Sequence, residues 1–150
     1  MSALTKFILV FTLALGSVVA HALEFRSVAV SKAVLYDAPS TSAKKTLLLS
    51  QFYPVEIIVN LGDWLKVRDA QGVISWVEAK QLTTKRMALV KTNSAEIRVA
   101  ADPSSKLVAI IEKDLVLEVL DVTASNGWIK VKHRDGLTGY ILTSSIWGVD

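Results

Sequence analysis

The segment Trp64-Leu65-Lys66-Val67-Arg68 recurs 64 residues later as Trp128-Ile129-Lys130-Val131-Lys132. Apolar and basic side chains alternate in both copies, and a period of two is typical of a half-buried β-strand. A period of 64 residues is longer than the common solenoid repeats, so we interpret each copy as a small domain. The repeat therefore predicts two copies of one β-domain in tandem.

The repeat extends outward from this strand on both sides. The matches at the same spacing are Pro39-Ser40 with Pro103-Ser104, Gly72 with Gly136, Val73 with Leu137, Trp76 with Tyr140, and Val77 with Ile141. The turn dipeptides Gly62-Asp63 and Asn126-Gly127 precede the repeated strand. The glycine at the third place of each following loop suits a three-residue bulged hairpin. About five short strands per copy predict a small, strongly bent β-barrel, and no stretch after residue 23 has helical periodicity.

The alternation also assigns side chains to faces. Leu65 and Val67 share one face of their strand, while Trp64, Lys66 and Arg68 share the other. A three-residue loop then places Lys66 opposite Trp76 and Leu65 opposite Val77, and in the second copy Lys130 opposite Tyr140. We expect the two cores to contain the apolar set: Leu65, Val67, Val77, Ile129, Val131 and Ile141. Trp147, just past the last strand, is expected to plug the second barrel.

The opposite face carries an unusual mixture of aromatic and basic residues. We call these residues the aromatic–basic stripes: Trp64, Lys66, Arg68 and Trp76 in the first copy, and Trp128, Lys130, Lys132 and Tyr140 in the second. Rigid aromatic faces beside cations suit an extended peptide, a carboxylate or a sugar ring. The alternative is structural: the long basic side chains cover the aromatic rings, or the stripes pack between the copies.

Residues 1–22 have the form of a secretory signal peptide. Lys6 is the only charged residue before Glu24, and it precedes an uncharged stretch from Phe7 to Val19 and the triplet Ala20-His21-Ala22. A basic start, a short apolar core and an A-x-A end are the parts of such a signal. We expect cleavage after Ala22 and a periplasmic or secreted protein without stable membrane insertion. A retained membrane helix is the alternative, but it needs a longer apolar run of roughly 20 residues.

Composition and motifs argue against most catalytic and nucleic-acid chemistry. The chain has 150 residues, no Cys and two His, and its net charge is +3, with acidic and basic residues interspersed. We therefore expect no thiolate or metal site, no cofactor and no nucleic-acid partner. His133-Arg134-Asp135 matches the His-Arg-Asp triplet of the protein-kinase catalytic loop. It lies in a predicted hairpin loop, however, and the other residues of the kinase motif are missing. We predict no catalytic residues and no enzymatic activity.

Several of these segments together resemble the bacterial SH3-type domain. They are the pattern I-x-V-x-x-x-P-S from Ile97 to Ser104, the stretches 126–131 and 135–141, and in the first copy Leu35, Pro39 to Ser42, 62–67 and Trp76-Val77. The resemblance covers nearly all of residues 27–147 and implies an all-β chain of two tandem SH3-like barrels. We place the domains at 23–82 and 87–150, after a signal peptide at 1–22 and joined by a linker at 83–86. The chain also resembles small exported tandem SH3-like proteins of Gram-negative bacteria.

The resemblance implies a binding function and leaves the ligand open. Such domains commonly bind cell-wall peptides, and many accompany wall hydrolases. Members of this family frequently have an Arg after the I-x-V triplet. This chain has Ala100 at that place in the second copy and Tyr36 in the first, so no role of that Arg carries over. Val34-Leu35-Tyr36-Asp37 looks like the polyproline-binding signature of eukaryotic relatives, but it lacks the next Tyr and is absent from the second copy. We expect a binding module for an envelope peptide, glycan or protein; the alternatives are a structural subunit with buried stripes and, more remotely, a small wall hydrolase.

Overall fold

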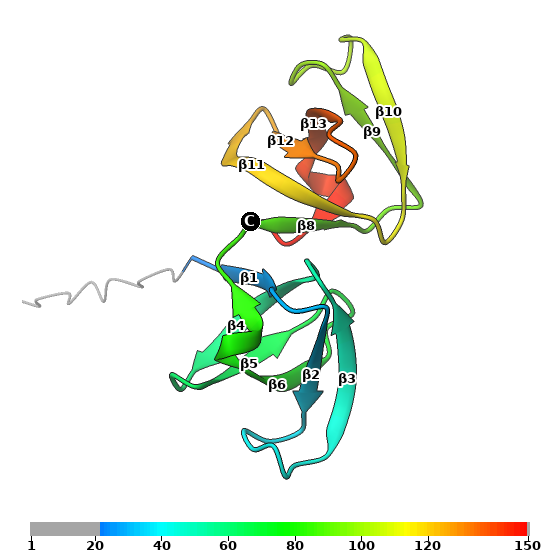
Figure 1. Ribbon diagram of the computed structural model, residues 1–150. Helices are drawn as coiled ribbons and strands as arrows, with labels where there is room; N and C mark the ends of the chain where they lie inside the picture. The colour runs from blue at the N-terminus through cyan, green and yellow to red at the C-terminus, as the bar shows by residue number, and fades with distance from the viewer. Residues whose placement is uncertain (1–21, 150) are drawn as a thin grey trace, which may run out of the picture.

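Short antiparallel strands form almost all the regular structure in the computed structural model, which describes residues 22–149 (Figure 1). The predicted signal peptide, apart from Ala22, lies outside the described residues. Over residues 22–149 the fold is all-β, as predicted, with two seven-stranded antiparallel sheets and two single-turn 3-10 helices. None of the helical turns in residues 22–149 approaches the length and hydropathy needed to cross a bilayer.

The two sheets have the same topology. The first has the order β3-β2-β6-β5-β4-β1-β7 and the second the order β10-β9-β13-β12-β11-β8-β14. The first domain contains β1 (Glu24–Val28), β2 (Lys32–Tyr36), β3 (Lys45–Ser50), β4 (Pro54–Asn60), β5 (Trp64–Arg68), β6 (Ile74–Glu78), η1 (Ala79–Gln81) and β7 (Leu82–Thr83). The second contains β8 (Met87–Val90), β9 (Ser94–Arg98), β10 (Leu107–Glu112), β11 (Val116–Ser125), β12 (Trp128–Lys132), β13 (Thr138–Leu142), η2 (Thr143–Ser145) and β14 (Ile146–Trp147).

The hairpins that carry the stripes have the predicted register. Lys66 pairs with Trp76 and Leu65 with Val77 across β5 and β6. Across β12 and β13, Lys130 pairs with Tyr140. The loops close as bulged hairpins because Gly72 and Gly136 adopt φ values of 87° and 96°, a region that side chains disfavour.

The six predicted core residues are all buried. Leu65, Val67 and Val77 are at most 1% exposed in the first core, and Ile129, Val131 and Ile141 are equally buried in the second. Each set belongs to its own cluster of buried apolar side chains. The chain therefore has two hydrophobic cores, one per barrel.

Shortening a core side chain should destabilise only the domain that contains it. We expect Val131→Ala to lower the stability of the second domain by about 1–3 kcal/mol, because it removes buried methyl groups and leaves a cavity. Denaturant unfolding followed by hydrogen–deuterium exchange of peptides from each domain would measure this. Equal loss of protection in both domains would contradict the separation of the cores.

The two domains contact each other through their first and last strands and the connecting segment (Figure 1). The rings of Phe25 and Trp147 meet edge to face, with centroids 5.3 Å apart. The Arg86 guanidinium lies over the Phe25 ring at 5.6 Å, and its Nη2 donates a hydrogen bond to the Gly148 carbonyl. The expectation that Trp147 plugs the second barrel is therefore wrong. Ile146, 2% exposed, occupies that core, and the neighbouring Trp147 side chain packs against the first domain.

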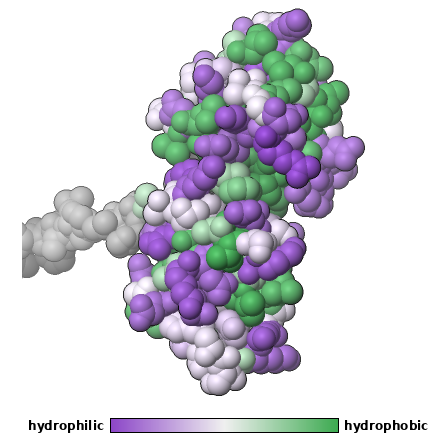
Figure 2. Space-filling view, viewed as in Figure 1, coloured by the Kyte–Doolittle hydropathy of each residue, from purple (hydrophilic) through white to green (hydrophobic). Residues whose placement is uncertain are grey.

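Hydrogen bonds to its backbone carbonyls tie the connecting segment to both domains. Ser27 Oγ of the first domain donates to the Lys85 carbonyl at 2.7 Å, and the Val119 N–H of the second donates to the Arg86 carbonyl at 3.0 Å. The Lys85 ammonium also pairs with the Glu118 carboxylate at 3.6 Å. Residues 85 and 86 therefore act as a fixed joint between the barrels, which Figure 2 shows as two adjoining lobes.

Candidate functional site

The stripe of the first domain forms a partly exposed aromatic surface. Trp64, Lys66 and Trp76 are all half-buried, on the face opposite the core residues of β5 and β6. The Lys66 ammonium lies over the Trp76 ring, 5.8 Å from its centroid. The Trp64 ring packs edge to face on the buried Tyr36, with centroids 5.6 Å apart. Tyr36 thus holds the indole in place while part of its surface faces solvent.

Arg68, the remaining member of this stripe, forms a structural ion pair. Arg68 Nη1 donates to Glu56 Oε2 at 2.9 Å, and Glu56 is only 7% exposed. A buried carboxylate needs a partner, since burying an unpaired charge is costly. Arg68 therefore neutralises Glu56, and the part of the stripe free to meet a ligand is Trp64, Lys66 and Trp76.

A hollow of about 340 Å³ adjoins this surface at Trp64. The other residues that line it are Asp63, Glu78, Ala79 and Lys80, all from the first domain. Lys80 and Glu78 form an exposed ion pair at 3.2 Å. The hollow therefore offers an indole face, a backbone turn and charges of both signs to a small group of a ligand.

The second stripe does not reproduce this surface. Lys130 and Lys132 are exposed and Tyr140 is half-buried, as expected, but Trp128 is only 5% exposed. The prediction of a matching exposed indole in the second domain is therefore wrong. The stripes are also not packed together between the copies, because the interdomain contacts described above come from other strands.

The neighbouring strand explains the difference between the two tryptophans. Trp64 stands directly opposite Glu78, whereas Trp128 stands opposite Leu142. Directly opposed side chains in an antiparallel pair share a face, so Leu142 gives Trp128 an apolar neighbour. Glu78 instead turns to Lys80 and to Gln81, whose Nε2 lies 3.4 Å from its Oε1.

The triplet His133-Arg134-Asp135 forms a hairpin turn, as expected. The Leu137 N–H donates to the Asp135 carboxylate at 3.0 Å, and His133 Nδ1 lies 2.9 Å from the same oxygen. These hydrogen bonds hold the pKa of Asp135 below its usual value, with the backbone donor contributing most. Within residues 22–149, no three His, Asp or Glu side chains lie close enough to share a metal ion.

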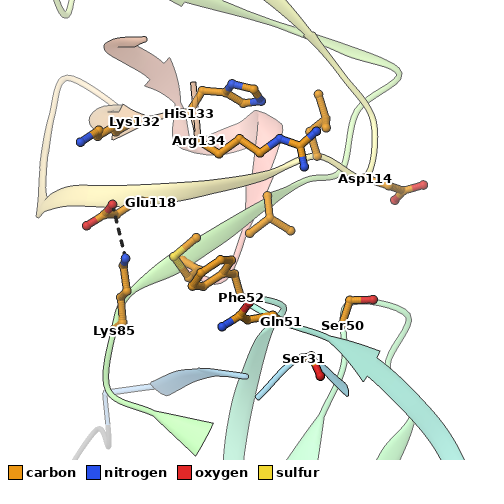
Figure 3. Close-up of a pocket in the computed structure, with 13 residues that line it drawn as sticks. Ser31, Ser50, Gln51, Phe52, Lys85, Asp114, Glu118, Lys132, His133 and Arg134 are labelled. Carbon is orange, nitrogen blue, oxygen red and sulfur yellow. Dashed lines mark ion pairs between the residues drawn. The ribbon is translucent and has the colours of Figure 1, made fainter. Parts of the chain in front are cut away.

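A groove lies between the domains, and of the residues that line it only Lys132 was predicted as a site residue. It has a volume of about 740 Å³. Figure 3 shows the side chains that line it. Phe52 and Gln51 come from the first domain, Lys85 from the connecting segment, and Leu115 and Arg134 from the second. These residues lie in turns and connections, where no period-two pattern marks a face.

Comparison with known families identifies both halves of the chain. The model of the bacterial SH3 domain matches residues 29–83 and again residues 91–148. The comparison with curated protein sequences returns no match.

Solved structures similar to this one include two proteins from Trichomonas vaginalis and one from Bacillus cereus. NlpC1 from T. vaginalis is 17% identical over 87% of this chain and 47% of its own, with a TM-score of 0.39. NlpC2 from the same organism is 14% identical over 84% and 48% of the two chains, with a TM-score of 0.37. An NlpC/P60 family protein from B. cereus is 16% identical over 83% and 56%, with a TM-score of 0.39. The matched part is about half the length of each of these proteins.

Proposed function

This chain belongs to the bacterial SH3 domain family, and we propose that it is a non-enzymatic, exported binding module of the cell envelope. The observation that carries this proposal is the aromatic surface of the first domain, where Trp64 and Trp76 remain partly exposed beside Lys66. A contiguous exposed apolar patch on a protein surface commonly marks an interaction site. The ligand class that suits this surface is a wall peptide, because its chain can stack on the rings and its carboxylates can meet Lys66.

Export to the periplasm, or secretion, is part of the proposal. It is supported by the signal-peptide pattern of residues 1–22. The non-enzymatic role is supported by the setting of the only His of the second domain. His133 pairs with Asp135 within its own turn, and no Ser hydroxyl between residues 22 and 149 forms a hydrogen bond with it.

Retention on purified cell wall tests the function. We expect the wild-type chain to co-sediment with peptidoglycan and Trp64→Ala to lose most of that retention. Removing an aromatic anchor of a binding surface commonly costs about 2 kcal/mol, which is roughly a thirtyfold loss of affinity. The matched control is Ile110→Ala, which removes an apolar side chain that is 61% exposed in the other domain.

Two results would count against this proposal. Retention of Trp64→Ala equal to that of the wild type would show that the first stripe does not bind the wall. Failure of the wild-type chain to co-sediment, together with capture of one folded envelope protein on the same surface, would favour the structural-subunit alternative.

A further inference from the structure

The repeat places two unlike residues at one strained backbone position beside the interdomain groove. Phe52, between β3 and β4, has φ 71°, and Asp114, between β10 and β11, has φ 68°. Their N–H groups donate to the carbonyls of Val28 and Val90, which are equivalent in the repeat, at 2.9 Å in both domains. The two turns are therefore copies of one conformation, and both line the groove.

Phenylalanine is a costly choice for this conformation. Asp and Asn tolerate a positive φ because their short polar side chains bond locally, whereas a bulky residue there is an outlier. The Phe52 ring is also 40% exposed, so core packing does not account for it. Strained residues of this kind are retained where a site needs their side chain. The conformation and exposure of Phe52 are therefore the first observation that favours a binding site in the groove.

The groove presents an apolar wall beneath a basic rim. Met87, Leu115 and Val116 line it together with the Phe52 ring, and the Lys85 ammonium lies 5.3 Å from that ring's centroid. Lys132 and Arg134 stand along the rim formed by the second domain (Figure 3). The site thus combines an aromatic platform with cations, within the volume range of ordinary ligand pockets.

Some of the basic side chains that line the groove are paired with carboxylates, and others are not. Lys85 is paired with Glu118, and His133 with Asp135. Lys132 and Arg134 form no ion pair with any residue between 22 and 149. The carboxylate of Asp114 points away from the centre of the groove (Figure 3). The field inside the groove therefore favours anions.

We propose that the interdomain groove binds an extended acidic peptide segment, at a site separate from the aromatic surface of the first domain. Its apolar side chains would lie on Phe52 and Leu115, and its carboxylates would meet Lys132 and Arg134. Arg is well suited to this role because its guanidinium binds a carboxylate with two parallel hydrogen bonds. The groove needs both domains, so the fixed joint at residues 85 and 86 is part of the site.

A labelled hexapeptide of alternating Glu and Leu, followed by fluorescence anisotropy, tests the proposal on the full chain. Lys132→Gln with Arg134→Gln should weaken binding by about tenfold or more, because two charge-assisted contacts are lost. The matched control is Lys44→Gln with Lys106→Gln, which changes the net charge equally at exposed positions outside the groove. Phe52→Asn should also weaken binding while raising the melting temperature, because it relieves the backbone strain.

Several outcomes would overturn the proposal. Equal weakening by the two double variants would mean that the peptide responds only to net charge. Equal binding of a Gln–Leu peptide would contradict the proposed contact between carboxylates and the cations. Unchanged binding by Phe52→Asn would contradict the proposed role of the Phe52 ring. A dimer seen by sedimentation and lost in Lys132→Gln with Arg134→Gln would place a second copy of the chain in the groove. Peptide binding that persists when Trp64→Ala has lost wall retention would support the separation of the two sites.

Discussion

Gly139→Ala should unfold the second domain at temperatures at which the first domain remains folded. Gly139 lies on β13, and a Cβ atom there would sit 2.5 Å from the Ile97 side chain and 2.7 Å from the Arg98 carbonyl oxygen. Ile97 is fully buried, and a backbone carbonyl cannot rotate away, so β13 and β9 would have to separate. Overpacking commonly costs about 1–3 kcal/mol and sometimes more, and we expect the upper end here. A barrel of this size has only about 3–5 kcal/mol to lose.

The first domain supplies the matched control. Ser75 occupies the place of Gly139, since Ser75 faces Val67 across the hairpin as Gly139 faces Val131. It carries a side chain there and is 2% exposed, and the Thr46 hydroxyl approaches its Oγ at 3.3 Å. Ser75→Ala should therefore cost only about 1 kcal/mol, the usual value of one hydrogen bond. Similar unfolding of both variants, measured by hydrogen–deuterium exchange of each domain, would contradict the steric argument.

Trp128→Ala should destabilise its domain far more than Trp64→Ala destabilises the first. Trp128 is 5% exposed, and truncating a buried indole costs about 3–5 kcal/mol. Trp64 is half-exposed and already meets water, so we expect a loss of about 1–2 kcal/mol from its contact with Tyr36. Chemical denaturation of the two variants, with the unfolding of each domain followed separately, measures this difference.

This pair of variants also separates stability from binding. Trp64→Ala is expected to lose wall retention while its domain stays folded, whereas Trp128→Ala is expected to lose the fold of its domain. If Trp128→Ala were as stable as the wild type, the burial of that indole would be irrelevant to the second barrel, and the asymmetry between the stripes would lose its physical basis.

The registers of the β5–β6 and β12–β13 hairpins could be predicted from the sequence because two local rules were sufficient. Alternation fixed which side chains share a face, and the three-residue loops ending at Gly72 and Gly136 set which residues stand opposite each other. Both rules operate within about a dozen residues, so they do not depend on how distant segments pack. The six core residues followed directly from them.

Alternation and loop length were not sufficient for every feature. Alternation placed Trp128 on the face of β12 opposite the core, but it did not take account of Leu142, which stands opposite Trp128 in the same hairpin where the first domain has Glu78. Trp147 packs on Phe25, which lies 122 residues earlier in the chain. The positive φ of Phe52 has no sequence signature, since a turn prediction expects Gly, Asn or Asp there.

The contact between Phe25 and Trp147 has a consequence for the order of folding. Within each barrel, hairpins such as β4–β5 and β5–β6 join near neighbours in sequence and can form early, because little loop entropy opposes them. The pairings of β1 with β4 and of β2 with β6 span longer stretches of chain and close the barrel. The interdomain contact joins the first strand to the last, so we expect it to form after both barrels have closed. Domain docking is generally slower than hairpin formation. The groove is consequently the last part of the molecule to mature, and partly folded chains would already have the aromatic surface of the first domain while they still lack the interdomain site.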